Sequence, residues 1–451
     1  MVPFFRSILS RIASGSSLRA RLVRATGWML AGSGLNQGLA MLASIGTARI
    51  LGKTAFGEFG AVRSTVMTMA ILAGGGLGMA TTRYVAALRT KDPERAGRLI
   101  GLVLTMAWTM TGIAAVACAL LARPIAVGIM QSENLRLPLM VSALALVFST
   151  VSSVQIGVIA GCEAFRPVAV LLAIEGFSAG ALMVTGAWFG GVTGAVLGFV
   201  IGTFISFLLR RRQVKVECRK AGIPLNAFRL GDLRQEVPFI TSAVVPSMLL
   251  VIGAQPAEWV ARMMLVRGPD GMAALGLFTA AYSWGQLVQF IPSQIASPAL
   301  TLLANLVGAG DWPAFRRLLV ESTGVVFGSA AVIAVPLALL SKFVMGLYGP
   351  AFRDGAGVFS AIVLAYALGS VWTIFRATFL AAGREWYQLA FTLAWGIALP
   401  LFFLVQGRRT AMTLALSYGI SFLVVVIAQF VAAWFLFRGS RRPAAVHEGV
   451  R

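Results

Sequence analysis

The chain has 451 residues, of which 58% are hydrophobic and only 12% are charged. A soluble protein has no means of burying so much apolar surface, so the composition excludes an ordinary soluble enzyme. The net charge of +22 is typical of nucleic-acid-binding proteins when the protein is soluble, so here the positions of the charges must decide their meaning.

Apolar runs long enough to cross a membrane recur along the whole chain. A helix needs about 20 apolar residues to cross about 30 Å of hydrocarbon. The runs predict an all-α polytopic membrane protein with about twelve transmembrane helices and no sizeable soluble domain. The predicted spans are 28–48, 64–88, 99–121, 137–160, 167–189, 192–209, 237–257, 272–300, 318–341, 358–382, 387–407 and 411–437.

The basic residues are distributed unequally between the two sides of these spans. With a cytoplasmic amino terminus, 25 of the 38 Lys and Arg residues fall on cytoplasmic segments and 11 on external ones. This bias predicts that both termini are cytoplasmic. Residues 1–26 are expected to form a basic amphipathic segment on the inner membrane face, and residues 438–451 a cytoplasmic tail. The charge therefore does not require a nucleic-acid partner.

A weak internal repeat relates the two halves of the chain. Residues 92–100 resemble residues 311–319, with an Asp six positions before an Arg in both, and residues 160–163 resemble residues 382–385. Similarity at a constant offset predicts a duplicated unit of six helices.

The repeat predicts two pseudo-symmetric six-helix lobes around a central cleft. Spans one to six form an N-lobe at 27–209, and spans seven to twelve form a C-lobe at 237–437. A cytoplasmic basic segment, 210–236, joins them, either as a plain linker or as a segment that binds lipid headgroups.

Two arginines lie inside predicted spans, where ionisable groups are costly and usually functional. Arg83 and Arg376 are each roughly six residues, or about 9 Å, from the cytoplasmic end of their span. The planar guanidinium suits phosphate oxygens, so the pair is a candidate receptor for a pyrophosphate headgroup. The alternative is that each side chain extends to the membrane interface.

A second basic group is predicted near the outer surface. It contains Arg49, Lys53, Arg63 and Arg262. These residues are candidates for receiving the same anion after a conformational change, with interface anchoring as the alternative.

Glu175 lies near the middle of the fifth predicted span. A carboxylate there must be neutral, paired or exposed to water, which makes it the candidate for coupling to H⁺ or Na⁺. The alternative is a charge partner for Arg83 or Arg376. Glu258 and Glu321 lie nearer predicted helix ends and carry less weight.

Three uncharged polar residues inside spans are candidates for contacts with a glycan. Asn36 and Gln37 lie in the first predicted span and Gln155 in the fourth. Their amides suit sugar hydroxyls, but they equally suit hydrogen bonds between helices.

No pattern in the sequence predicts an enzyme, a metal site or a cofactor. Gly52-Lys53-Thr54 ends like a phosphate-binding loop, but the glycine that the motif requires five positions earlier is Thr47. The single histidine, His447, lies in the polar tail, and the three cysteines lack metal-ligand spacing.

Several strings resemble the polysaccharide transporter family, the oligosaccharide-lipid flippases of the multidrug/oligosaccharidyl-lipid/polysaccharide exporter superfamily. In the first half they are residues 48–52, 56–60, 76–78 and 82–86; in the second half they are Arg262 and residues 276–281, 347–352 and 382–383. The family often has Asp-Arg at the end of span seven. This chain has Ala261-Arg262 there, with Glu258 four residues before the arginine.

The resemblance implies movement of an undecaprenyl-pyrophosphate-linked oligosaccharide across the bacterial inner membrane by alternating access, for synthesis of O-antigen, exopolysaccharide or capsule. It also implies membrane lipids, a polysaccharide polymerase and glycosyltransferases as partners. A cation-coupled multidrug exporter of the same superfamily and a lipid II flippase are the alternatives. Short external loops argue against a membrane polymerase or ligase.

Overall fold

The computed structural model describes residues 18–225, 236, 248 and 253–438. Every regular element within these ranges is helical, and none is a strand. Among the described residues, eight helices are long and apolar enough to cross a membrane, and a bent pair of helices raises the number to nine. The predicted fold class, an all-α polytopic membrane protein, is confirmed.

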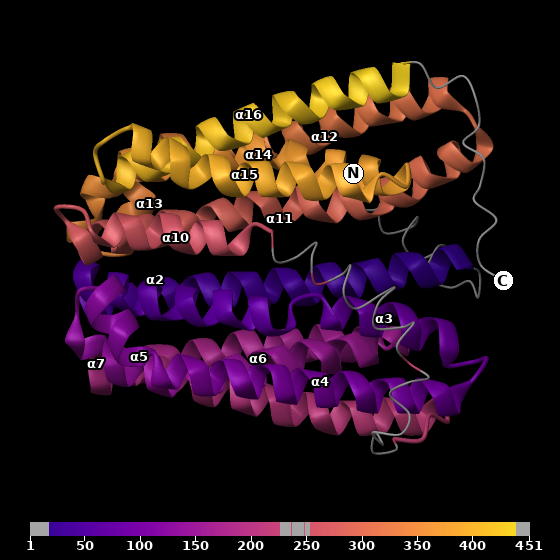
Figure 1. The fold of residues 1–451 in the computed structure, drawn as a ribbon, viewed down its shortest axis with the longest axis horizontal. Coiled ribbons are helices and arrows are strands. Elements are labelled where there is room, and N and C mark those ends of the chain that lie inside the picture. Colours follow the sequence, from indigo (N-terminus) through magenta and orange to yellow (C-terminus); the bar gives the residue numbers. More distant parts are fainter. Residues whose placement is uncertain (1–17, 226–235, 237–247, 249–252, 439–451) are drawn as a thin grey trace, which may run out of the picture. The chain divides into compact units, whose positions relative to one another are not determined.

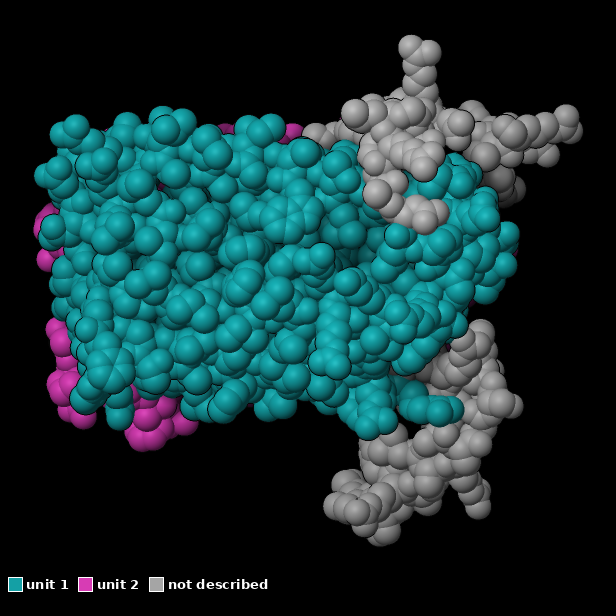
Figure 2. Space-filling model, turned by 90° about the horizontal axis from the view of Figure 1, so that it is seen from below, with its two compact units in different colours: residues 1–252 teal, residues 253–451 magenta. Residues whose placement is uncertain are grey.

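The chain divides into two compact units, residues 1–252 and 253–451 (Figure 2). Unit 1 contains α2 (Leu18–Gly74), α3 (Leu77–Leu88), α4 (Pro93–Leu120), α5 (Ala122–Pro124), a π-helical turn at Ile125–Ile129, a 3₁₀ turn at Glu133–Leu135, α6 (Arg136–Gly161) and α7 (Phe165–Lys220). Unit 2 contains α10 (Gln255–Val266), α11 (Gly271–Ala309), α12 (Trp312–Leu339), α13 (Ser341–Leu347), a 3₁₀ turn at Pro350–Gly355, α14 (Ala356–Ala381), α15 (Glu385–Val405) and α16 (Ala411–Arg438).

Helix α7 is a hairpin of two antiparallel arms. Its 56 residues are interrupted at Gly190 and Gly191, where Gly191 has φ 55° and ψ −137°. A Cβ atom on Gly186 would lie 2.1 Å from the carbonyl oxygen of Gly194, so the arms pack backbone to backbone on either side of the break. The break falls where the sequence places the boundary between spans 167–189 and 192–209. The second arm, however, continues as helix to Lys220, into the predicted linker.

Helix α2 covers the first predicted span, the segment after it and the first part of the second predicted span. Its only non-helical residue is Gly52 (φ 75°, ψ 175°), and Figure 1 shows the chain running back along itself after this point. The polar loop predicted between spans 28–48 and 64–88 is therefore wrong, because the helix resumes at Lys53. The second predicted span is itself bent by 43° between α2 and α3, next to Gly76 (φ 87°).

The sequence repeat coincides with two pairs of similar helix junctions. Asp92 caps α4 by accepting a hydrogen bond from the backbone N–H of Arg95 (2.9 Å), and Asp311 caps α12 by accepting one from Ala314 (3.0 Å). The chain then leaves α6 through Glu163 (φ 59°) and leaves α14 through Gly383 (φ 66°). A side-chain cap and a left-handed turn therefore recur at matching places in the two halves.

The boundaries of the predicted lobes stay a prediction. The seventh predicted span, 237–257, lies mostly outside the described residues, so the number of twelve spans also stays a prediction. Unit 1 ends at Ile252, and helix α7 occupies the first part of the predicted linker 210–236.

Helix α14 is the central helix of unit 2. In its most apolar stretch of 18 residues, 67% of the residues are buried, whereas in the corresponding stretch of α12 only 22% are buried. It packs against α11, α12 and α16 through fully buried side chains such as Phe359, Ile374 and Phe379. This central position brings side chains of α14 next to those of several other helices.

Candidate functional site

A hydrogen-bonded network of polar side chains begins on α10, inside unit 2. Glu258 and Arg262 are one helical turn apart, and the guanidinium donates to Oε2 of Glu258 at 3.0 Å. The hydroxyl of Tyr282, on α11, donates to the same oxygen at 2.9 Å. Both charged side chains are largely buried, with 12% and 14% exposure, so each needs the other as its counter-charge.

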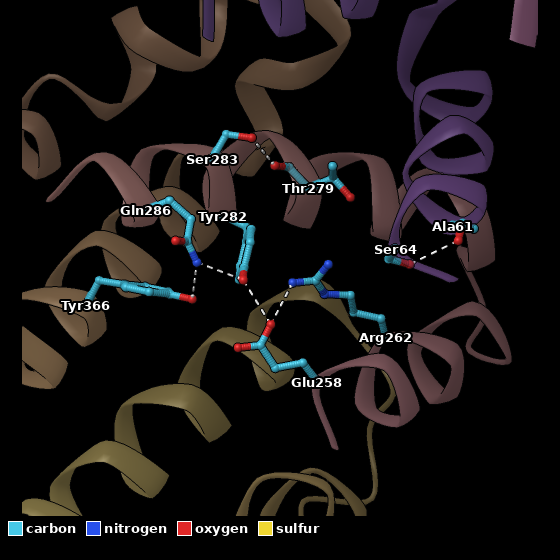
Figure 3. Close-up of polar contacts among 9 residues, drawn as sticks. All are labelled: Ala61, Ser64, Glu258, Arg262, Thr279, Tyr282, Ser283, Gln286 and Tyr366. Carbon is cyan, nitrogen blue, oxygen red and sulfur yellow. Dashed lines mark hydrogen bonds and ion pairs between the residues drawn. The ribbon is translucent and has the colours of Figure 1, made fainter. Parts of the chain in front are cut away.

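The network continues through an amide to α14 (Figure 3). The side-chain N–H₂ of Gln286 donates to the hydroxyl of Tyr282 at 2.8 Å and to that of Tyr366 at 3.2 Å. Tyr282 and Gln286 lie four residues apart and therefore face the same side of α11. The network thus joins α10, α11 and α14 through side-chain hydrogen bonds.

Aromatic rings hold the guanidinium of Arg262 from another side. Its carbon lies 4.1 Å from the ring centre of Tyr282 and 6.0 Å from that of Phe278. The face of an aromatic ring attracts a cation, most strongly where water is absent. Arg262 is therefore held by a carboxylate and two aromatic rings.

A cavity of about 410 Å³ lies beside this network. It is lined by side chains from α11, α14, α15 and α16 and from the start of α10. Its polar lining consists of Gln255, Glu258, Gln286, Gln289, Ser293, Thr373 and Arg376, and its aromatic lining of Tyr366, Trp372, Trp395 and Phe422. Amides and hydroxyls facing flat rings form a mixed surface, which differs from the apolar packing of a core.

The aromatic wall of the cavity is rigidly packed. The rings of Trp372 and Trp395 meet edge to face with centres 5.7 Å apart, and Trp395 stacks on Phe422 with centres 5.4 Å apart. The indole N–H of Trp395 is buried and has no acceptor among the described residues. A buried donor without a partner costs free energy, and the ring of Trp395 rather than its N–H contributes to the cavity wall.

Arg376 brings a cation to the same cavity. The residue lies in the last turns of α14, and within the described ranges it has no carboxylate within ion-pair distance. The sequence marks this arginine as a candidate for binding pyrophosphate, and the structure places its side chain on a cavity wall. Arg83 lies exposed on α3 in unit 1, so the convergence of the two arginines on one anion stays a prediction.

The remaining basic candidates lie at different depths. Arg49 is exposed three residues before the break at Gly52, whereas Arg63 is eleven residues after it, about 16 Å along the helix. The guanidinium of Arg63 lies 5.6 Å from the ring centre of Phe199, on α7. Lys53 is half-buried and Arg262 belongs to the network in unit 2, so the proposed role of this group as a second anion site stays a prediction.

Glu175 has a partner that the sequence does not predict. Its carboxylate forms an ion pair with Arg210, on the other arm of α7, and not with Arg83 or Arg376. The side chain of Arg210 is only 4% exposed, whereas Glu175 is 26% exposed. Glu175 is therefore a paired carboxylate, and its role in coupling to an ion stays a prediction.

The three glycan-contact candidates belong to unit 1, and none of them lines the cavity in unit 2. Gln155 is buried, and its side-chain oxygen has no donor among the described residues. Asn36 packs tightly against Gly176, because a Cβ atom there would lie 2.7 Å from its Oδ1. Gln37 is half-buried. Asn36 thus serves the packing of α2 on α7, and a contact with a glycan stays a prediction for all three.

Sequence reasoning missed most of the cavity, although one signal was present. Gln286, Gln289 and Ser293 recur with spacings of three and four in an otherwise apolar segment, which places them on one face of α11. Glu258, which the sequence ranks below Glu175, proves to be the carboxylate of the network. The described residues contain no group of three His, Cys, Asp or Glu side chains able to hold a metal ion.

Comparison with known proteins identifies the family. The family model described as "Polysaccharide biosynthesis protein" matches residues 22–304, more than half of the chain. The chain belongs to this family. It is similar to the EPS I polysaccharide export inner membrane protein EpsE of Ralstonia nicotianae, with 23% identity over 388 residues and 85% of each chain covered.

Solved structures of transporters share the fold of this family member. An inward-facing multidrug resistance MATE family transporter of the MOP superfamily has a TM-score of 0.78 at 15% identity, covering 91% of this chain and 98% of its own. The lipid II flippase MurJ, in an inward closed conformation, has a TM-score of 0.71 at 11% identity, covering 90% and 87%. The polysaccharide biosynthesis protein described here therefore has the fold of these membrane transporters.

Proposed function

We propose that the protein is a flippase that moves undecaprenyl-pyrophosphate-linked oligosaccharides from the cytoplasmic to the outer leaflet of the bacterial inner membrane. Membership of the polysaccharide biosynthesis family supports a sugar-linked substrate. The inner-membrane export protein that the chain resembles supports the location and the direction of transport. The observation that carries the proposal is the cavity in unit 2, because its chemistry suits both parts of such a substrate.

The cavity lining suits a sugar. Gln255, Gln289 and Thr373 offer amide and hydroxyl groups to sugar hydroxyls. The rings beside them suit the apolar faces of a pyranose. Polar groups then fix orientation while flat rings supply contact area, as in other small-molecule sites.

Arg376 suits the phosphate of the same substrate. A guanidinium presents paired N–H donors to phosphate oxygens and stays charged at any physiological pH. The long polyprenyl tail needs no polar site, because it stays in the bilayer. The duplicated helix junctions support alternating access, which is common among transporters built from internal repeats.

The charge of the cavity argues against a cation exporter of the same superfamily. Glu258 is its only carboxylate among the described residues, and Arg262 already neutralises it. A cationic drug would therefore meet the uncompensated charge of Arg376. We also propose coupling to H⁺ or Na⁺ through Glu175, because protonation of this carboxylate would release Arg210 from its ion pair. Polymerase and glycosyltransferases that use the same lipid are the proposed partners.

The test is the leaflet distribution of undecaprenyl-linked oligosaccharides in cells with and without the protein. A probe that reaches only the outer face measures the outer pool, and lipid extraction measures the total. We expect deletion to empty the outer pool while the total accumulates, and expression from a plasmid to restore it. An unchanged outer pool in a strain that lacks redundant flippases would rule out the proposal.

A further inference from the structure

A second cavity lies on the hairpin of α7, outside the site described above. This groove has a volume of about 710 Å³, and all its lining residues come from the two arms of α7. Three of them are basic, namely Arg166 from the first arm and Arg212 and Lys220 from the second. No acidic residue lines the groove within the described part of the chain.

The rest of the lining is mostly apolar and open to the surroundings. Val170 and Ile174, on the first arm, are 47% and 39% exposed, and Leu209, on the second, is half-buried. Exposed aliphatic side chains beside a cluster of cations are unusual on a surface that faces water. They suit an amphipathic ligand with an anionic head and an apolar chain.

The length of the arms places the cations at the membrane interface. Arg166 lies 24 positions before Gly190, and Arg212 lies 21 positions after Gly191, which corresponds to about 36 Å and about 32 Å of helix. The hydrocarbon layer is about 30 Å thick, so a hairpin whose break lies at one face brings these cations to the headgroup level of the other. Ile174 lies 16 positions from the break, about 24 Å, and therefore within the hydrocarbon.

A tryptophan supports this placement independently. The guanidinium of Arg166 lies 5.6 Å from the ring centre of Trp28, on α2, and the indole is 41% exposed. Tryptophan is enriched at the level of the lipid headgroups. Arg166 and Trp28 therefore mark the same interface.

From this arrangement we propose that the α7 groove binds an anionic phospholipid of the bilayer. Arg166, Arg212 and Lys220 bind the phosphate, and an acyl chain lies along Val170, Ile174 and Leu209. Lys220 also donates to Glu217 at 2.9 Å, so it approaches the phosphate as the shared partner of a carboxylate. The site is separate from the cavity in unit 2 and does not depend on the proposed transport function.

The experiment compares two triple variants that remove the same charge. The first, R166Q/R212Q/K220Q, neutralises the lining cations. The second, R211Q/K215Q/R219Q, neutralises exposed cations on the same helix that do not line the groove. Native mass spectrometry and titration in mixed micelles measure binding of phosphatidylglycerol, with phosphatidylcholine, whose headgroup is zwitterionic and carries no net charge, as the control.

We expect the first triple variant to weaken phosphatidylglycerol binding by at least about tenfold, because each cation near a charged headgroup contributes on the order of 1 kcal/mol and a tenfold change in affinity is about 1.4 kcal/mol. The second is expected to change it by less than about twofold by the same reasoning, since its cations do not contact the lipid. Equal losses in the two variants would show diffuse attraction to the whole segment and overturn the proposal.

A third variant tests the acyl chain without changing any charge. Ile174→Trp fills the apolar part of the groove, and Leu208→Trp, at an exposed position outside the lining, is its control. We expect only Ile174→Trp to reduce phosphatidylglycerol binding. Unchanged phosphatidylglycerol binding by Ile174→Trp would overturn the proposed position of the acyl chain, even where the first triple variant fails to fold.

Discussion

Arg262 and Glu258 depend on each other, because both charges are buried beside a cavity. Arg262→Met leaves the carboxylate of Glu258 without its ion-pair partner, a change that costs about 3–5 kcal/mol for a buried pair. We predict a marked fall in the apparent Tm of the purified protein in detergent. The double variant E258Q/R262M removes both charges and should recover part of the lost stability, which a double-mutant cycle on Tm measures.

Tyr282 provides a matched control for this pair. Tyr282→Phe removes the hydroxyl that donates to Glu258 at 2.9 Å but keeps the ring on which Arg262 lies. Tyr282→Ala removes both. A smaller loss of stability for Phe than for Ala would show that the ring contributes to holding the cation. Equal losses would attribute the contribution to the two hydrogen bonds of the hydroxyl, one donated to Glu258 and one accepted from Gln286.

Arg376 is expected to serve transport rather than stability. The structure shows no ion-pair partner for it among the described residues, so Arg376→Ala leaves no orphaned carboxylate there. A hydrogen bond to a charged group is worth about 1.5–3 kcal/mol, so we predict a loss of roughly 10- to 100-fold in substrate binding or flipping. Arg376→Lys keeps the charge and should retain part of the activity.

The control for Arg376 is Arg317→Ala. Arg317 is 82% exposed and pairs with Glu321 on the surface of α12, where an ion pair contributes little. Both variants are measured for the outer-leaflet pool of lipid-linked oligosaccharide at equal expression. A fully active, well-folded Arg376→Ala protein would remove this residue from the binding site.

At the scale of elements, the α7 hairpin depends on glycines that let its arms touch. A Cβ atom on Gly194 would lie 1.9 Å from the carbonyl oxygen of Gly186, which is far inside van der Waals contact. Gly194→Ala should force the arms apart and cost about 1–3 kcal/mol, seen as a lower Tm. Gly112→Ala, where nothing lies within 4 Å of the new atom, should instead stabilise α4, by about 0.5–1 kcal/mol.

The hydrophobic runs predict most helices. In two places, however, the helix continues through a polar segment that the sequence places outside the spans. Between predicted spans 28–48 and 64–88 a single glycine, Gly52, turns the chain, and the helix resumes at once. Arg210, Arg211 and Arg212 suggest a cytoplasmic linker. Successive residues on a helix point about 100° apart, so Arg210 faces inward to Glu175 while its two neighbours face outward.

The candidate site was harder to predict, because it is assembled from contacts between distant segments. Tyr366 is 80 residues from its hydrogen-bond partner Gln286, and Trp395 and Phe422 come from two further helices. Spacing within one helix identifies polar faces, as on α11, but it does not show which faces meet. Arg376 stands out in the sequence as a candidate, because a charge inside an apolar run is informative by itself.

The sidedness of the whole molecule can be tested at the α7 hairpin, whose two ends are expected at opposite membrane faces. Phe189, beside the break, is 87% exposed, and Arg219 lies 28 positions after Gly191, about 42 Å of helix. The distribution of basic residues predicts that the end at Arg219 is cytoplasmic. In a background without native cysteines, Phe189→Cys should react with an impermeant maleimide on intact cells and Arg219→Cys only after permeabilisation. The reverse pattern would invert the topology and move the anionic-lipid groove to the outer leaflet, whereas labelling of both from one side would contradict a hairpin that crosses the bilayer.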